Sequence, residues 1–239
     1  MQTLNGLKMC VGTLAMVVLL ASLMIGSGSS RAAPEARTLR ALYGLGPPTS
    51  LRAAKTALVL VDFQQEFVRG GLPLPSSRAA IRSAVDLAAW ARRSGILVVV
   101  VHNVIDRPGT PLFRRGTAAA ALVPELAPRA GDLVIEKATG GGFSRTDLDA
   151  ELRSRGIDTL IVGGFMTHLA VLITASDASV LGYHVLVAGD ATATRTLPGA
   201  AGHDGVDAAE LQRVALAAVA DRVADVMPGS AIRAIPVQR

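Results

Sequence analysis

Two charged residues of this chain stand where apolar runs end, and their types suit acid–base chemistry. Asp62 follows the run ALVLV, and Lys137 follows the run LVIE. Burial beside apolar neighbours raises the pKa of a carboxyl group toward neutrality, which suits a general acid or base. A strand end is also a common place for an aspartate that only caps a loop, so position alone leaves both interpretations open.

Lys137 stands out because the cations of this chain are mostly arginine. Beyond residue 33 there are two lysines, Lys55 and Lys137, against twenty arginines. A compact ammonium group can lie beside a carboxylate and change its own pKa, which a guanidinium group does not do. Lys137 is therefore a candidate partner for a carboxylate, with an ordinary surface lysine as the alternative.

The segment GGFMTHLAV, residues 163–171, has the composition of a strand-to-helix turn. Its glycines permit a sharp bend, and Thr167 is a suitable residue to cap the helix. Amide groups in the first turn of such a helix can bind an oxyanion or a carboxylate. Hydrolases often place a nucleophile in a turn of this kind, but here position 170 is alanine.

Several residues near these positions could contribute to a site. His168 could bind substrate or transfer a proton, although a packed or capping histidine fits equally well. His102 with Asp106 is too weak a pattern for a metal site, and we predict neither a metal nor a cofactor. Aromatic side chains flank the candidate positions, where they could line a pocket or belong to the core: Phe63, Phe67, Phe143 and Phe165.

The elements that must position these residues alternate along the chain. Helices are predicted by apolar positions three and four apart at 78–94, 146–155, 167–181 and 208–224. Strands buried on both faces are predicted by continuous apolar runs at 57–61, 96–101, 133–135, 159–162, 185–187 and, as a further candidate, 231–236. This alternation is typical of a parallel sheet, so we predict one three-layer α/β/α domain.

In such a sheet the chemistry takes place at the carboxyl ends of the strands. We therefore expect the two charged residues and the glycine-containing turn to lie at one edge of the sheet. The residues that follow the predicted strands are Asp62, Gln64, His102, Asn103, Glu136, Lys137, Gly163 to Thr167, and Asp190.

The N-terminus has the pattern of a secretory signal peptide. Lys8 gives a positive start, an apolar stretch follows at 11–25, and Ser30 and Ala32 suit a cleavage site. The apolar stretch is shorter than the ~20 residues of a membrane-spanning helix, which favours cleavage over an uncleaved anchor. We predict a periplasmic or secreted protein, with a signal peptide at 1–33, a leader at 34–54 that packs on the domain, and a domain at 55–239.

Composition excludes several classes of protein. Aromatic residues make up 3% of the chain, which argues against stacking platforms for nucleic acid. The one cysteine, Cys10, excludes a zinc finger or a disulfide framework. The formal charge of +5 falls to +3 without Lys8 and Arg31, and there is no dense basic run. We predict a small-molecule substrate, no nucleic-acid partner and no stable membrane contact once the signal is cleaved.

Four stretches of the chain resemble the isochorismatase-like hydrolases, also called cysteine hydrolases. The order and spacing of these stretches make the resemblance specific, and the wording GGFMTH and DATATRTLP is most similar to the streptothricin-hydrolase-like branch. The matching stretches are LVLVDFQQEFVRGGLPLP (58–75), 134–171, 174–198 and ALAAVADRVADV (215–226).

The resemblance implies a parallel six-stranded sheet with the Rossmann-like order 3-2-1-4-5-6, and a homodimer or larger assembly. It also implies a non-proline cis peptide within 165–167 and an Asp–Lys–Cys triad. The aspartate of the triad falls on Asp62, the lysine on Lys137, and the cysteine on Ala170. We expect the substrate to contact Gln64, Phe67, Phe143, Met166, Thr167, His168 and Leu169.

Ala170 departs from the family pattern, because the thiolate of cysteine-using members attacks the substrate and forms an acyl-enzyme. Three hypotheses follow. One is a hydrolase without a thiol, like true isochorismatases, in which Asp62 is the general acid, Lys137 holds its charge state and His168 positions substrate. The others are an inactive relative that binds a small molecule or a partner, and an amide hydrolase whose cysteine was replaced by Ala170. We favour the first, because a buried charged pair without a function tends to be lost.

Overall fold

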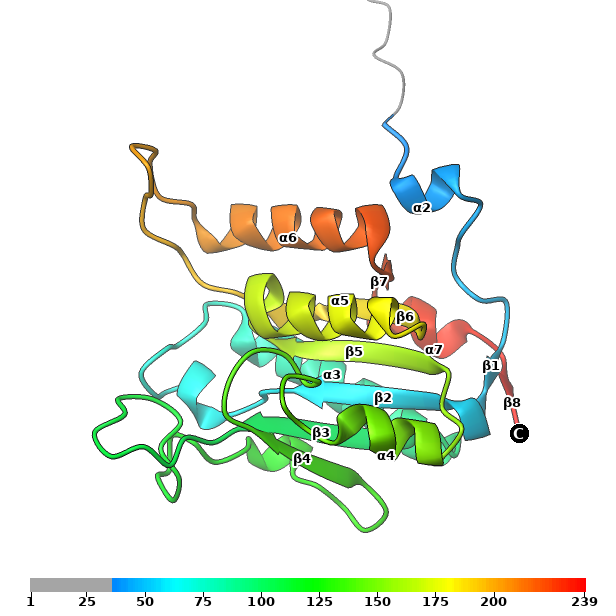
Figure 1. The fold of residues 1–239 in the computed structure, drawn as a ribbon, viewed down its shortest axis with the longest axis horizontal. Helices are drawn as coiled ribbons and strands as arrows, with labels where there is room; N and C mark the ends of the chain where they lie inside the picture. The colour runs from blue at the N-terminus through cyan, green and yellow to red at the C-terminus, as the bar shows by residue number, and fades with distance from the viewer. Residues whose placement is uncertain (1–35) are drawn as a thin grey trace, which may run out of the picture. The chain divides into compact units, whose positions relative to one another are not determined.

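Six parallel strands of mostly Val, Leu and Ile form the central sheet of the computed structural model, which describes residues 36–239. The order across the sheet is β4-β3-β2-β5-β6-β7, which confirms the predicted order (Figure 1). The strands are β2 (Thr56–Val61), β3 (Leu97–Asn103), β4 (Leu133–Lys137), β5 (Thr159–Phe165), β6 (His184–Ala193) and β7 (Asp225–Met227).

Helices cover both faces of the sheet and complete the predicted three layers (Figure 1). One face packs against α3 (Ser77–Arg93) and α7 (Gly229–Ala234), through side chains such as Leu58 and Leu60. The other face packs against α4 (Leu148–Ser154), α5 (Leu172–Val180) and α6 (Ala208–Arg222). Because successive strand residues point to opposite faces, a continuous apolar run supplies both cores at once.

Short helical turns join these elements. The 3₁₀ turns are η1 (Ala53–Lys55), η2 (Gln65–Phe67) and η3 (Pro124–Leu126). A π-helical turn, η4 (Thr167–Val171), precedes α5. The predicted helix at 167–181 is therefore an α-helix with a wider first turn, and such π-turns occur often at functional sites.

The strand suggested at 231–236 is wrong. Those residues fall mainly in α7, and the sixth strand is β7 at Asp225–Met227. A short apolar run fits a helix or a buried strand equally well. Pro228 precedes the helix as its N-cap residue, and the sequence GSAIRA then forms a short helix.

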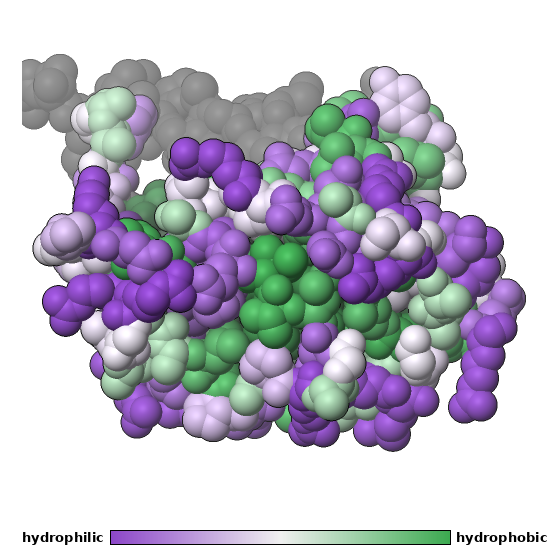
Figure 2. Space-filling view, turned by 60° about the horizontal axis from the view of Figure 1, so that its bottom comes forward, coloured by the Kyte–Doolittle hydropathy of each residue, from purple (hydrophilic) through white to green (hydrophobic). Residues whose placement is uncertain are grey.

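Residues 1–35 are outside the described part of the chain, so the predicted signal peptide at 1–33 lies there. Residues 38–239 form one compact unit. Within the described residues, no helix is both long enough and apolar enough to cross a membrane. The side of this unit on which β4 lies is covered mainly by polar side chains, with an apolar area at its centre (Figure 2).

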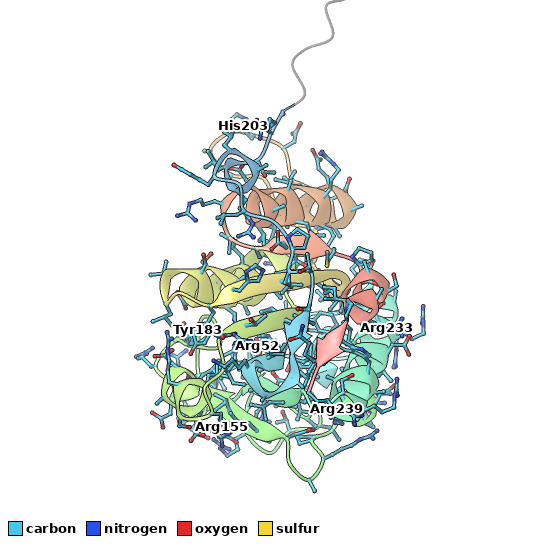
Figure 3. The ribbon with its side chains drawn as sticks, turned by 90° about the vertical axis from the view of Figure 1, so that its right-hand side faces the viewer. Arg52, Arg155, Tyr183, His203, Arg233 and Arg239 are labelled. Atoms are coloured by element: carbon cyan, nitrogen blue, oxygen red, sulfur yellow. The ribbon has the colours of Figure 1, made fainter. Side chains whose placement is uncertain are left out.

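Part of the predicted leader contacts the rest of this unit. In α2 (Leu39–Leu42), the buried Arg40 forms an ion pair of 2.6 Å with Asp225 of β7. Strand β1 (Leu51–Arg52) pairs in parallel with β8 (Val237–Gln238). Figure 3 shows the side of the molecule on which this pair of strands lies, with Arg52 and Arg239 labelled. Residues 38–54 are thus held to the domain at several points.

Candidate active site

Asp62 lies just beyond β2, at the carboxyl edge of the sheet. Its backbone is in the left-handed region, with φ of 56°, which aspartate tolerates better than most residues. The Asp62 amide donates to Val101 O at 2.8 Å, and the Asp62 carbonyl accepts from the Gln64 amide at 2.7 Å. These bonds hold the tight turn in which the carboxyl group is fixed.

Lys137, the last residue of β4, forms a buried ion pair with Asp62. Its Nζ donates to Asp62 Oδ2 at 2.7 Å, and the two side chains are 1% and 4% exposed. Asp62 Oδ1 is buried without a hydrogen-bond partner. The Asn103 amide is also near this carboxyl group, but it donates to Gln64 Oε1 at 2.8 Å. One carboxylate oxygen is therefore paired, and the other is left for another molecule.

Burial raises the pKa of Asp62 to about 6, against the charge and the hydrogen bond of Lys137 and the smaller effect of the nearby Asn103 amide, which all lower it. The desolvation of the carboxylate is thus the larger effect. A carboxyl group with this pKa exists in both protonation states near neutral pH. It can donate a proton and take it back, as general acid–base catalysis requires.

Gln64 is buried and fully hydrogen-bonded. Its Nε2 donates to Asn103 O at 2.8 Å and to Ala120 O at 2.7 Å, while its Oε1 accepts from the Asn103 amide. The side chain therefore joins the turn after β2 to the end of β3 and to the segment around Ala120. Gln64 is not among the residues that line the pocket described below.

The turn that carries Ala170 begins differently from the sequence prediction. Met166 is the N-cap residue of η4, so Thr167 does not cap the helix, and its hydroxyl donates to Gln212 Oε1 at 2.6 Å. The amides of Leu169 and Val171 donate to Met166 O at 3.0 and 3.2 Å. These two amides are thus occupied within the turn. A cis peptide joins Phe165 to Met166, within the predicted segment.

Thr174 joins this turn to the loop that follows Lys137. Its hydroxyl donates to Ala170 O at 2.6 Å and accepts from the Gly142 amide at 2.8 Å. The loop approaches α5 closely, since a Cβ on Gly141 would lie 2.8 Å from the Thr174 amide nitrogen. A single buried hydroxyl therefore fixes the spacing between the Ala170 turn and the loop after Lys137.

A pocket of about 370 Å³ opens where these groups meet. Asp62, Lys137 and Ala170 line it together, with Phe67 and Met166 beside them. The rest of the wall comes largely from loops after β2 and β3: Leu72, Ile105, Thr110, Pro111, Leu112 and Phe113. The volume is at the small end of ligand pockets, which suits a small molecule.

Glu66 holds the two wall loops together. This buried carboxylate accepts from the Gly71 amide at 2.6 Å through Oε1 and from the Phe113 amide at 3.2 Å through Oε2. Phe113 has a positive φ of 55° and packs against Phe67, with ring centroids 5.4 Å apart. The sequence contained a weak signal for this wall, which was the apolar pair at 112–113 within a loop of Pro, Gly and Arg.

Four of the residues expected to contact substrate lie outside the pocket lining. These are Gln64, Thr167, Phe143 and His168. Phe143 packs against Tyr183, with ring centroids 6.0 Å apart, and His168 Nδ1 is hydrogen-bonded to the hydroxyl of Thr194. Burial, with a smaller effect of Arg195, lowers the pKa of His168, which favours its neutral form. Of the expected contacts, Phe67, Met166 and Leu169 do line the pocket.

Two other polar candidates are also occupied elsewhere. Asp190 accepts from the Gly229 amide at 2.7 Å and fixes the start of α7. His102 lies 3.6 Å from Glu136, while Arg115 bridges Glu136 and Asp106 at 2.8 and 2.7 Å. Across residues 36–239, no group of three His, Cys, Asp or Glu side chains is placed to hold a metal ion.

Residues 56–230 match the Isochorismatase domain. A secreted isochorismatase effector, Isc1, of Verticillium dahliae is 34% identical, over 77% of this chain and 93% of that protein. A streptothricin hydrolase of Streptomyces noursei is 33% identical, over 86% of this chain and 82% of that protein.

Solved structures have the same fold. An isochorismatase from Pseudomonas putida KT2440 superposes with a TM-score of 0.75 and 31% identity, over 82% of this chain and 98% of that one. The domain match covers most of the chain, and it includes the strand ends and the turn that form the pocket. This protein belongs to the isochorismatase family of hydrolases.

Proposed function

We propose that this protein hydrolyses a small molecule without a thiol nucleophile, with Asp62 as the general acid and base. The observation that carries the proposal is the pocket itself. A carboxyl group with its pKa raised to about 6 is paired with Lys137 and keeps one oxygen without a partner. Ala170, which we assign to the family's cysteine position, lines the same pocket and offers only a methyl group.

Hydrolysis of an enol ether requires no protein nucleophile. Protonated Asp62 gives its proton to the terminal carbon of the C=C bond, and the positive charge then rests on the ether carbon and oxygen. A water molecule adds to that carbon and returns a proton to Asp62. The resulting hemiketal breaks its C–O bond to give an alcohol and a carbonyl compound. Lys137 stabilises the Asp62 carboxylate that exists between the two proton transfers.

The decisive experiment compares the purified protein with two variants on a panel of enol ethers and amides. We expect the unmodified protein to hydrolyse at least one enol ether, and Asp62→Asn to lower kcat/KM by about 100-fold or more. Asp86→Asn is the matched control, because Asp86 lies on α3 with its side chain 64% exposed. If Asp62→Asn has no greater effect than this control, the assignment of the acid is wrong.

The variant Ala170→Cys separates this proposal from the alternatives. If the unmodified protein is inactive on the whole panel and Ala170→Cys gains amide hydrolysis, the proposal fails. The protein would then be an inactive relative or an amide hydrolase that lost its cysteine. If the kcat/KM of Ala170→Cys for an enol ether stays within a few-fold of that of the unmodified protein, the reaction does not depend on a nucleophile at position 170.

We also propose that the protein is exported and acts as a homodimer or larger assembly. The N-terminal pattern of residues 1–33 supports export, and so does the word "secreted" in the name of the relative from Verticillium dahliae. Mass spectrometry of the mature N-terminus after expression with the full leader tests cleavage near residue 33. Light scattering of the mature protein tests the assembly.

A further inference from the structure

The active-site pocket has almost no net charge. Asp62 and Lys137 are the charged side chains in its lining, and they are paired with each other at 2.7 Å. Arg115, on the wall loop, is directed to Asp106 and Glu136 and does not line the pocket. The described lining therefore contains no cation that is free to bind an anionic group.

Most of the remaining lining is apolar. Aromatic and aliphatic side chains come from the turns after β2, β3 and β5: Phe67, Ile105, Leu112, Phe113, Met166 and Leu169. A carboxylate or phosphate that enters such a pocket loses its hydration without gaining a counter-ion, which is costly. The lining thus selects against anions and favours a small molecule that is mostly apolar.

Two acceptor oxygens of the pocket lining have no hydrogen-bond donor in the structure. Asp62 Oδ1 and Asn103 Oδ1 are both buried without a partner, and both residues line the pocket. Leaving a buried acceptor unpaired costs about 1–3 kcal/mol, and a bound molecule with an N–H or O–H group would remove that cost. The site is therefore complementary to a donor group at the end near Asp62.

We propose that this pocket selects an uncharged small molecule with an apolar body and an N–H or O–H group directed at Asn103 Oδ1, which leaves Asp62 Oδ1 for the proton transfer, and that Leu169 helps to exclude anions. This inference rests on the proposed function for the identity of the site. Leu169 follows His168 and precedes Ala170 in η4, and it lines the pocket while remaining 46% exposed. It is thus placed at the opening, where a cation would meet an incoming anion.

Calorimetric titration at pH 7.5 tests the inference with benzamide, cyclohexanecarboxamide, benzoate and phthalate as probes. We expect the unmodified protein to bind at least one of the two amides, and to bind both carboxylates about tenfold more weakly or worse. Leu169→Arg should narrow or reverse this preference by strengthening the binding of benzoate. The control Val180→Arg adds the same charge on α5, where Val180 is 88% exposed and away from the pocket lining, and should leave the preference unchanged.

Several outcomes would overturn the inference. One is a carboxylate that binds the unmodified protein as tightly as the amides, and another is a failure of all four probes to bind. A third is an equal gain in benzoate binding for Leu169→Arg and Val180→Arg, which would mean a general effect of charge. Binding does not require turnover, so a protein that prefers the amides yet hydrolyses nothing would refute the proposed function and leave this selectivity intact.

Discussion

Asp62 Oδ2 and Lys137 Nζ lie 2.7 Å apart, although 75 positions separate the two residues in the chain. They meet because β2 and β4 both pair with β3 in parallel, so their carboxyl ends reach the same edge of the sheet. The remaining oxygen of the carboxyl group has no partner. One oxygen of the Asp62 carboxyl group is therefore bound to Lys137, and the other can form a hydrogen bond with a bound molecule.

The raised pKa of Asp62 predicts the pH profile of the proposed activity. A general acid must start the reaction protonated, and burial raises the pKa of Asp62 to about 6. We expect kcat/KM to be nearly constant below pH 6 and to fall about tenfold per pH unit well above it. Rates over pH 4.5–8.5, within the range where the protein stays folded, give the measurement. A kcat/KM that rises through pH 6 would instead assign Asp62 as a base.

Glu66 is predicted to set the shape of the pocket wall. In Glu66→Gln, an amide NH₂ replaces one of the two oxygens that accept from Gly71 and Phe113, so one amide loses its acceptor. We expect a loss of about 1–3 kcal/mol in the free energy of unfolding, and a KM that rises more than kcat falls. Urea denaturation and steady-state kinetics measure the two effects.

Glu125→Gln is the matched control for this change. Glu125 lies 3.5 Å from Arg78 in an exposed ion pair, so its replacement should alter stability by less than 1 kcal/mol. An equal loss in the free energy of unfolding for the two variants would show that the hydrogen bonds from the two loop amides to Glu66 do not stabilise the protein measurably.

Thr174 is predicted to be a positioning residue, because it joins the Ala170 turn to the loop after Lys137. Thr174→Val keeps the shape but leaves the Gly142 amide and Ala170 O without this partner, so we expect a loss of about 1–3 kcal/mol in stability. The rate kcat should fall while KM changes little, since the substrate contacts remain. Thr174→Ser retains the hydroxyl and should recover most of kcat. If kcat is as low in Thr174→Ser as in Thr174→Val, the two hydrogen bonds of the Thr174 hydroxyl do not maintain kcat.

Arg40 is predicted to make the leader part of the folded unit. Removing it leaves the nearly buried Asp225 without its guanidinium partner, so Arg40→Ala should cost about 3 kcal/mol in stability. Arg52→Ala removes the exposed ion pair with Asp158 and should cost less than 1 kcal/mol. Thermal denaturation of both variants measures the difference. Similar melting temperatures would mean that α2 adds little to the stability of the domain.

Much of the sheet was predictable because the inner strands β2, β3, β5 and β6 are buried on both faces over most of their length and are therefore continuous apolar runs. The prediction of burial on both faces is wrong for the edge strand β4, in which Val134 is 44% exposed. The runs at 57–61 and 159–162 lie within β2 and β5. The three-residue strand β7 has no such signal, since DVM is too short and too polar at its start. The extension of β6 to Ala193 depends on a register shift opposite 162–164, which pairing between strands determines and local sequence does not.

The site was predictable where it depends on strand ends and much less so where it depends on loops. Because catalytic groups of parallel sheets lie at the carboxyl ends of the strands, the sequence predicts Asp62 and Lys137 at the same edge, and the structure places them in contact. The wall at 105–113 has no periodic pattern, and its position depends on the bonds from Glu66 across the chain. The roles of these residues in a reaction remain predictions for the experiments above.

The pairing of β1 with β8 has a practical consequence. Leu51–Arg52 precedes β2 by a few residues, so the C-terminal strand that pairs with it lies at the amino ends of the sheet, opposite the pocket. A tag, a fluorophore or a solid support attached after Arg239 would therefore leave the pocket facing solution. The protein can therefore be attached through its C-terminus, on the side of the described domain that is opposite the pocket.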